Sequence, residues 1–211
     1  MMNPAEFANI AQAEDQFWWY RGMRRILFRM LDPYVRGARF DRVLEAGCGT
    51  GHFALALERR YGWKMFPADL AREGLEYALS LGAQRLTQAD ISALPFASAS
   101  FDALVSMDVM VHLPPGREAA ALSEFARVTK PGGLVVLRVA ALDILRSRHS
   151  EFCMERQRFT RSRLLRAAAA VGLEVLRSSY ANSLLLPVAL VVSGVASVAV
   201  AISSRRAPSS T

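Results

Sequence analysis

The chain has 211 residues, of which 52% are hydrophobic and 21% are charged. This composition excludes an intrinsically disordered protein, and the length suits one domain with small additions at its ends. The formal net charge of +7 comes almost entirely from arginine, since Lys64 and Lys130 are the only lysines. The basic residues form no dense tract of the kind that nucleic-acid-binding arms carry, so we expect no nucleic-acid partner.

Apolar residues recur at helical spacing from Ala5 to Tyr34, which predicts one long helix that Pro33 and Gly37 bring to an end. After Asp41, short apolar runs alternate with helical stretches, the pattern of βαβ units around a parallel sheet. The predicted strands are 42–46, 64–68, 83–88, 102–107, 134–140 and 173–180, and the predicted helices are 53–61, 72–81, 116–129 and 161–171. Thr160 is the expected N-cap of the last helix, and Pro131-Gly132-Gly133 is the expected turn before the fifth strand.

The tail is open to two interpretations, because no charged residue occurs from Ser178 to Ser204. A span over 184–202 is just long enough for a membrane helix, which needs about 20 apolar residues. The other interpretation is a short helix at 184–192, a turn at Gly194 and a buried strand at 195–203, which the valines favour. We expect the second arrangement, with membrane contact through 183–202 as the alternative.

The cysteines and the N-terminus indicate the cellular compartment in which we expect the protein. Cys48 and Cys153 are too few for a disulfide framework and stand at no metal-ligand spacing, so we expect a reducing compartment and no metal site. The first ten residues carry neither the basic start nor the apolar run of a secretory signal. A cytoplasmic location is the resulting expectation.

A glycine-rich loop follows the first predicted strand, Glu45-Ala46-Gly47-Cys48-Gly49-Thr50-Gly51. Glycines let the backbone turn sharply and bring its N–H groups against a ligand, and the next helix N-terminus adds donors. A dinucleotide loop of the form G-x-G-x-x-G would need its third glycine at position 52, where this chain has His52. The acid two residues ahead of the first glycine would repel a pyrophosphate, but it would attract the positively charged methionine end of S-adenosylmethionine.

Two more acids close the following strands. Asp69 ends the second strand, near the spacing of roughly 20 residues at which an acid meets the ribose hydroxyls of a nucleoside ligand. Asp90 ends the third, and its carboxylate would accept a hydrogen bond from the amino group of an adenine ring. Ile91 after it would pack against that ring. Because ligands of open parallel sheets bind outside the carboxyl ends of the strands, we expect Glu45, Asp69 and Asp90 at one edge.

With these motifs the chain resembles the class I S-adenosylmethionine-dependent methyltransferases, in the subgroup of the ubiquinone and menaquinone biosynthetic enzymes and of bacterial saccharide or secondary-metabolite enzymes. The resemblance covers about residues 42–176 and rests on 43–51, Asp69, 89–96, 101–107 and 122–134. It implies a Rossmann-like α/β fold with a seven-stranded sheet, mostly parallel with an antiparallel last strand, and helices on both faces. Pro67-Ala68 before Asp69 and the short tail depart from the usual pattern.

The resemblance also implies a division of the chain and a cofactor site. Residues 1–40 would form a helical lid, 41–182 the S-adenosylmethionine-binding domain, and 183–211 an apolar helix and last strand with a disordered end. The glycine loop would line the methionine moiety, Asp69 the ribose, and Asp90 with Ile91 the adenine. The full set of expected cofactor-binding residues is Glu45, Gly47, Cys48, Gly49, Gly51, Asp69, Leu70, Asp90, Ile91 and Met107.

Three segments are candidates for the acceptor site. The aromatic run Trp18-Trp19-Tyr20 resembles the lid helix of bacterial relatives, with core packing as the other interpretation. His112 follows the fourth strand, as a general base or as a structural histidine. His149 and Arg158 belong to a stretch that resembles a His- and Arg-bearing loop of the same relatives. There His149 would deprotonate a hydroxyl while arginines bind an anionic group, and a solvated basic loop is the alternative.

The expected function is methyl transfer from S-adenosylmethionine to a small-molecule acceptor, with a hydroxyl of a saccharide or secondary metabolite favoured and an anionic group on the acceptor allowed for. His112 and His149 are the expected catalytic residues, and a base is needed only if the acceptor is a hydroxyl. The alternatives are carbon methylation of a quinone or lipid precursor and a non-catalytic S-adenosylmethionine-binding protein. A monomer or a homodimer fits equally well.

Overall fold

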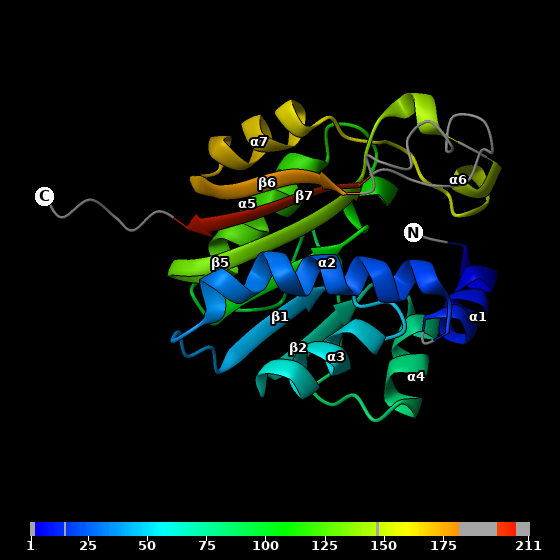
Figure 1. The fold of residues 1–211 in the computed structure, drawn as a ribbon, viewed down its shortest axis with the longest axis horizontal. Helices are drawn as coiled ribbons and strands as arrows, with labels where there is room; N and C mark the ends of the chain where they lie inside the picture. The colour runs from blue at the N-terminus through cyan, green and yellow to red at the C-terminus, as the bar shows by residue number, and fades with distance from the viewer. Residues whose placement is uncertain (1–2, 15, 147, 182–197, 206–211) are drawn as a thin grey trace, which may run out of the picture.

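The computed structural model describes residues 3–14, 16–146, 148–181 and 198–205, and within them seven strands form one sheet (Figure 1). The strand order is β3-β2-β1-β4-β5-β7-β6. The strands are β1 (Arg42–Ala46), β2 (Lys64–Asp69), β3 (Thr87–Gln88), β4 (Phe101–Met107), β5 (Thr129–Ala140), β6 (Leu173–Ala181) and β7 (Val198–Arg205). The α-helices are α1 (Pro4–Ala13), α2 (Trp18–Val35), α3 (His52–Tyr61), α4 (Arg72–Ser80), α5 (Glu118–Val128), α6 (Arg148–Phe152) and α7 (Arg161–Ala170).

The strand directions match the expected fold. The pairs β1–β2, β1–β4, β2–β3 and β4–β5 are parallel, whereas β7 runs antiparallel to both β5 and β6. The order of the strands reverses between β1 and β4, and this is the point at which open α/β sheets bind their ligands. The fold therefore places the end of β1, with its glycine loop, at the ligand-binding position.

Helices cover both faces of the sheet (Figure 1). Alternating side chains of the strands separate two cores, because successive residues of a strand point to opposite faces. On one face Val43 packs in a cluster with Leu27 of α2 and Leu57 of α3. On the other face Leu44 packs in a cluster with Phe125 of α5 and Leu164 of α7. The sheet is thus a middle layer between two helical layers, as the βαβ pattern predicts.

The single N-terminal helix predicted from Ala5 to Tyr34 is wrong, because the chain forms α1 and α2 with a break between them. Phe17 at the break is extended, with φ −75° and ψ 125°. Tertiary packing gives the reason: Phe7 of α1 approaches Gly74 of α4, whereas α2 crosses the sheet, and one straight helix cannot do both. Pro33 does not end the helix either, since α2 continues to Val35.

Two smaller predictions also need correction. The expected strand at 83–88 is only Thr87–Gln88, because Arg85 has φ 57°, a left-handed conformation that interrupts extended backbone. The turn expected at 131–133 lies inside β5 as an irregularity in pairing, which moves from Phe101 opposite Thr129 to Ala103 opposite Leu134. A side chain on Gly133 would come within 2.7 Å of the Asp102 carbonyl oxygen, so this close approach requires glycine.

The C-terminal strand settles part of the question about the tail. The strand expected at 195–203 is β7 at Val198–Arg205, which pairs with β5 from Leu134 to Ala140. Across the described residues, no helix is long and apolar enough to span a membrane. The helix expected at 184–192, the turn at Gly194 and the disordered end at 206–211 fall outside the described residues.

Candidate cofactor and acceptor site

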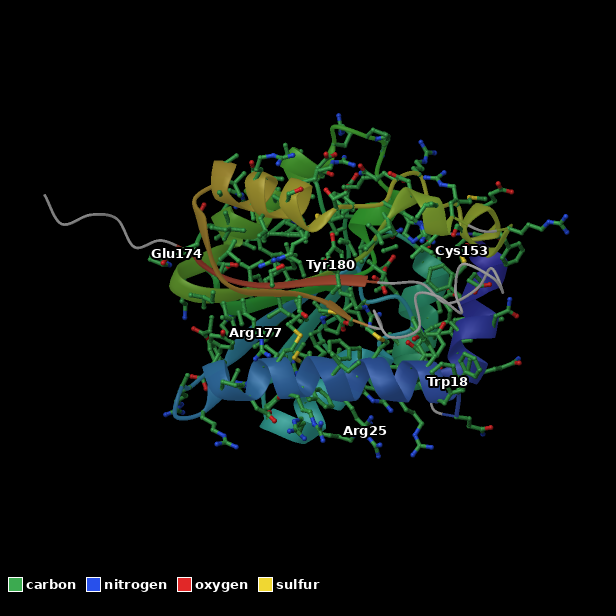
Figure 2. All side chains as sticks on the ribbon, turned by 45° about the horizontal axis from the view of Figure 1, so that its top comes forward. Trp18, Arg25, Cys153, Glu174, Arg177 and Tyr180 are labelled. Atoms are coloured by element: carbon green, nitrogen blue, oxygen red, sulfur yellow. The ribbon has the colours of Figure 1, made fainter. Side chains whose placement is uncertain are left out.

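A pocket of about 740 Å³ opens at the carboxyl edge of the parallel strands. Its walls come from the glycine loop, from the ends of β2, β4 and β5, and from the N-terminal segment that includes α1 and the start of α2. Residues far apart in the sequence therefore meet there, and Figure 2 shows Trp18 and Cys153 at the same end of the molecule. The volume falls in the range of small-molecule and cofactor sites.

The glycine loop is fastened to β2 by backbone hydrogen bonds. The N–H groups of Gly47 and Cys48 donate to the Ala68 carbonyl oxygen at 2.8 and 2.9 Å, and the Gly49 N–H donates to Oδ2 of Asp69 at 2.8 Å. Gly47 has φ 83°, and a Cβ built on it would lie 2.2 Å from Cγ2 of Val109. The loop is thus a preformed cradle whose shape excludes a side chain at Gly47.

Glu45 is the most unusual charged group of the pocket. Only 1% of the residue is exposed, and its Oε2 is buried with no hydrogen-bond partner among the described residues. Burial raises the pKa of Glu45 well above its usual value, and the charges of Glu14 and Asp69 raise it further. An ammonium or sulfonium group would satisfy this carboxylate, whereas a pyrophosphate would add repulsion. The orphan oxygen and the glycine cradle together fit the methionine end of S-adenosylmethionine.

Asp69 is the last residue of β2, and Asp90 lies just after β3, as expected. The Asp69 carboxylate accepts hydrogen bonds from the N–H groups of Gly49 and Ala71, each at 2.8 Å. Burial raises the pKa of Asp69, and these backbone donors oppose that rise. Oδ1 of Asp90 accepts from the Ser92 N–H at 2.7 Å, which orders the loop after β3. Both carboxylates line the pocket and keep lone pairs for ligand hydroxyl or amino groups.

Nearly every expected cofactor residue reaches the pocket. Gly51 is the exception: it is the N-cap of α3, with φ 74°, and a side chain there would lie 2.5 Å from Cβ of Ala78. Its structural role is therefore the close packing of α3 against α4. The expected residues that line the pocket are Glu45, Gly47, Cys48, Gly49, Asp69, Leu70, Asp90, Ile91 and Met107.

His112 lies in the pocket wall, in a short 3-10 helix at Met110–His112. Its Nδ1 is 3.3 Å from the carbonyl oxygen of Met154, and a carbonyl oxygen can only accept. The hydrogen bond therefore assigns the proton to Nδ1 and leaves the lone pair on Nε2. Burial lowers the pKa of His112, which favours this neutral form. His149 belongs to α6, but its side chain is outside the described residues.

The aromatic run at the start of α2 lines the mouth of the same pocket. Trp18 is 58% exposed, whereas Trp19 and Tyr20 are half-buried. Burial raises the pKa of Tyr20 to about 12, with smaller contributions from the charges of Glu14 and Glu6. Tyr20 is therefore a neutral hydroxyl at physiological pH. The run contributes both to the pocket and to packing against the sheet, so the two interpretations hold for different side chains.

Arg158 corrects the expected acceptor site. The residue is 3% exposed and does not line the pocket. Its guanidinium donates to Glu155 at 3.0 Å and to Oγ of Ser150 at 2.7 Å, so it holds the loop rather than a substrate. Arg156, two residues earlier, lines the pocket instead. The local pattern of arginines carries no information about which of them is buried.

One ion pair in the pocket wall was not predicted from the sequence. Arg138 of β5 donates from Nε to Oδ2 of Asp108 at 2.8 Å. Asp108 lies directly after β4. Asp108 has φ 56°, and its Oδ1 is buried with no partner among the described residues. Asp108 stands at the end of its strand as Asp69 and Asp90 do at the ends of theirs. An acid at the end of a predicted strand is visible in the sequence. Glu14, which accepts from the Thr50 hydroxyl, was also missed.

The described residues contain no group of three His, Cys, Asp or Glu side chains placed to hold a metal ion. The pocket's polar groups include carboxylates that do not converge on one point, backbone N–H groups, the imidazoles of His52 and His112, and the guanidinium groups of Arg138 and Arg156. This donor set suits an organic ligand with a positive charge, hydroxyl groups and an amino group.

Comparison with known proteins agrees with the geometry. Residues 43–133 match the family model of a methyltransferase domain. The chain is 35% identical over 140 residues to a malonyl-[acyl-carrier protein] O-methyltransferase of Erwinia billingiae, covering 66% of this chain and 53% of the relative. It is 30% identical over 110 residues to the O-methyltransferase resE of Aspergillus sclerotiorum, covering 49% and 41%. The chain thus spans about half the length of the curated relatives it matches.

Solved structures share the fold. A SAM-dependent methyltransferase of Methanosarcina mazei superposes with a TM-score of 0.67 at 19% identity, over 84% of this chain and 97% of that one. At this identity the likeness shows the fold alone, and the matched sequence carries the family assignment. The strand order, the glycine loop and the matched segment agree, and residues 43–133 are a methyltransferase domain of the class I S-adenosylmethionine-dependent family.

Proposed function

We propose that the protein transfers a methyl group from S-adenosylmethionine to an oxygen of a small-molecule acceptor, with a hydroxyl of a saccharide or secondary metabolite favoured. The observation that carries this proposal is the buried Glu45 carboxylate with an unpartnered Oε2 beside a glycine cradle. Ionising a buried carboxyl group without a partner costs several kcal/mol, and a cationic ligand offsets that cost. Two matched relatives are named O-methyltransferases, which favours oxygen over carbon as the acceptor atom.

Each cofactor group has residues suited to it in this proposal. Glu45, with the loop Gly47, Cys48 and Gly49, would hold the methionine moiety, and Asp69 with Leu70 would face the ribose. Asp90 and Ile91 would hold the adenine, and Met107 would lie near the reacting centre. The cofactor brings an activated methyl group on a positively charged sulfur, so the protein mainly has to align the acceptor with it.

His112 is the base that the geometry supports for a hydroxyl acceptor. Its Nδ1 proton is engaged by the Met154 carbonyl, so Nε2 would take the proton that the hydroxyl loses as its oxygen bonds to the methyl carbon. Trp18, Trp19 and Tyr20 would form the opposite wall of the acceptor site, within a lid made by residues 1–40. Arg156 replaces Arg158 as the candidate for an anionic group on the acceptor. His149 stays a second candidate base.

Carbon methylation of a quinone or lipid precursor is the second candidate. The observation in its favour is the apolar part of the wall, where Phe7, Ile10, Met23 and Leu113 line the pocket. Such an acceptor would need no base at His112, because a phenolic hydroxyl that activates its ring is acidic enough to give its proton to water. The ring proton that the methyl group replaces would also pass to water after the carbon–carbon bond forms. The two candidates therefore differ in how they respond to loss of the imidazole.

The test is a screen for S-adenosylhomocysteine production with hydroxylated saccharides, phenolic metabolites and quinones as acceptors, run beside calorimetric titration with S-adenosylmethionine. We expect turnover with a hydroxylated acceptor, and His112→Gln should lower kcat while leaving the cofactor Kd unchanged. Turnover of a quinone that His112→Gln does not slow would favour carbon methylation. Binding of the cofactor without turnover of any acceptor class would support a binding protein and refute the enzyme.

A further inference from the structure

The outer face of α2 carries a stripe of exposed arginines, Arg21, Arg25 and Arg29, here called the basic stripe. The spacing of four residues places them on one face of the helix, over a length of about 12 Å. No ion pair joins any of them to another described residue. Figure 2 shows Arg25 pointing away from the body of the protein. The basic stripe is therefore uncompensated positive charge on a rigid element.

The neighbouring charges do not neutralise this stripe. Arg24 is directed to Nδ1 of His52 at 3.0 Å, on the inner side of the helix. Asp32, the acid of α2, accepts from Arg60 at 2.8 Å and from the Tyr61 hydroxyl at 2.8 Å. Ordinary protein surfaces intersperse both signs of charge. A face with arginines only is suited to an anionic partner.

The stripe ends in exposed aromatic residues at the mouth of the pocket. Phe17 is 48% exposed and Trp18 is 58% exposed, with ring centroids 5.8 Å apart, and both line the pocket. Across the mouth, Phe152 and Met154 are 44% and 48% exposed on either side of the pocket residue Cys153. Large apolar side chains exposed together mark a site of interaction rather than a solvated surface. Basic and apolar surface thus adjoin where a substrate would enter.

We propose that this face, made of the basic stripe with Phe17, Trp18, Phe152 and Met154, docks on an anionic lipid bilayer. Arginines bind lipid phosphates while tryptophan and phenylalanine enter the headgroup region, which is where aromatic residues concentrate in membrane-bound proteins. Glu151 is the exposed acid beside Phe152, and the stripe outweighs it. Docking in this orientation turns the pocket mouth toward the bilayer. The pocket's apolar wall then suits an acceptor that reaches it from the lipid.

The docking does not depend on methyl transfer, so it can be tested without an acceptor. The full chain is mixed with vesicles of phosphatidylcholine alone and with vesicles that also contain phosphatidylglycerol, and the bound fraction is measured by sedimentation. We expect binding to the anionic vesicles only, with weakening as salt rises. Arg25→Glu/Arg29→Glu should weaken that binding at least about thirtyfold, since each arginine near an anionic surface contributes about 1 kcal/mol.

The matched control is Arg117→Glu/Arg166→Glu, which makes the same change in net charge at exposed residues of the α5 and α7 side. This control should keep most of the binding. Tryptophan emission should shift to shorter wavelength on anionic vesicles, and Trp18→Phe should remove most of that shift while binding persists. Equal losses in the two double variants would overturn the proposal, because they would show a diffuse effect of net charge.

A nucleic acid is the competing occupant, and the same variants decide between the two. Binding to single-stranded RNA that Arg25→Glu/Arg29→Glu abolishes, together with no binding to either vesicle, would overturn the lipid proposal in favour of RNA. An unshifted tryptophan emission on anionic vesicles would also count against it, since the aromatic end would then stay in water.

Discussion

The narrowest steric constraint in the site is at Gly47, and replacing it by alanine tests the loop geometry directly. The new Cβ would lie 2.2 Å from Cγ2, 2.6 Å from Cγ1 and 2.8 Å from Cβ of Val109. The backbone φ of 83° adds a second penalty, of about 1–2 kcal/mol for a residue with a side chain. Overpacking of this kind costs about 1–3 kcal/mol. We expect Gly47→Ala to lower the free energy of unfolding by about 2–5 kcal/mol in total.

The two penalties can be separated by a second substitution. Val109→Ala removes both Cγ atoms but leaves Cβ at 2.8 Å, so it should relieve part of the overpacking and none of the backbone cost. The double variant should therefore recover part of the overpacking cost of about 1–3 kcal/mol relative to the sum of the single changes. The assay is urea unfolding followed by circular dichroism, with all four proteins measured together.

The outcome that refutes this reasoning is equally definite. A Gly47→Ala protein within about 0.5 kcal/mol of the parent would show that Val109 does not press on the loop. A destabilised Gly47→Ala protein that Val109→Ala does not rescue would show that the two Cγ atoms contribute nothing to the cost. Gly49→Ala is the matched comparison, because its Cβ would meet nothing closer than 4.0 Å, at Phe7.

Three further predictions follow from the buried polar groups. Arg158→Met should lower the free energy of unfolding by about 3 kcal/mol or more, because it leaves Glu155 without its ion-pair partner. The exposed Arg156 is the comparison, and Arg156→Met should change this free energy little. Chemical denaturation checks both variants, and equal effects would contradict the structural role of Arg158. Burial raises the pKa of Cys48 well above its usual value and that of Cys153 to about 12. Both thiols should therefore react with Ellman's reagent only after unfolding. Fast reaction in the native protein would show that the pocket wall is open. The pKa of His112 is lowered from 6.5 by burial. The rate of methyl transfer to a hydroxyl should therefore rise with pH through a value below 6.5 and then level off. A pH profile that His112→Gln leaves unchanged would show that His112 is not the base.

The parts of the fold with strong local signals were predicted closely. β1 occupies Arg42–Ala46 as expected, because a buried apolar run ended by a glycine loop leaves little freedom in its bounds. Thr160 caps α7 as expected, with its hydroxyl accepting from the Arg163 N–H at 3.3 Å. The antiparallel β7 was predicted from the family resemblance and from its valines, and its pairing with both β5 and β6 confirms that strand.

The errors arose where distant parts of the chain decide the structure. The break before α2 depends on Phe7 packing against α4, and helical periodicity alone continues through it. The burial of Arg158 depends on Glu155 and Ser150, and no spacing of arginines reveals it. Asp108 is a different case, because an acid directly after a strand of a parallel sheet is a signal that the sequence itself shows.

The most direct test of the cofactor site is calorimetric titration with S-adenosylmethionine in two buffers that differ in ionisation enthalpy. Burial raises the pKa of Glu45 well above its usual value, which favours the protonated carboxyl group in the free protein, and a cationic ligand favours the ionised form. We therefore expect binding to release a proton, and affinity to rise with pH through the range in which free Glu45 ionises.

Glu45→Gln should abolish the proton release and weaken binding, while Gln should leave the loop folded because it matches the shape of the native side chain. The proposed role of Glu45 predicts a release of protons that disappears in Glu45→Gln. The absence of any heat of binding in the parent protein, or binding with the same proton count in both proteins, would contradict it.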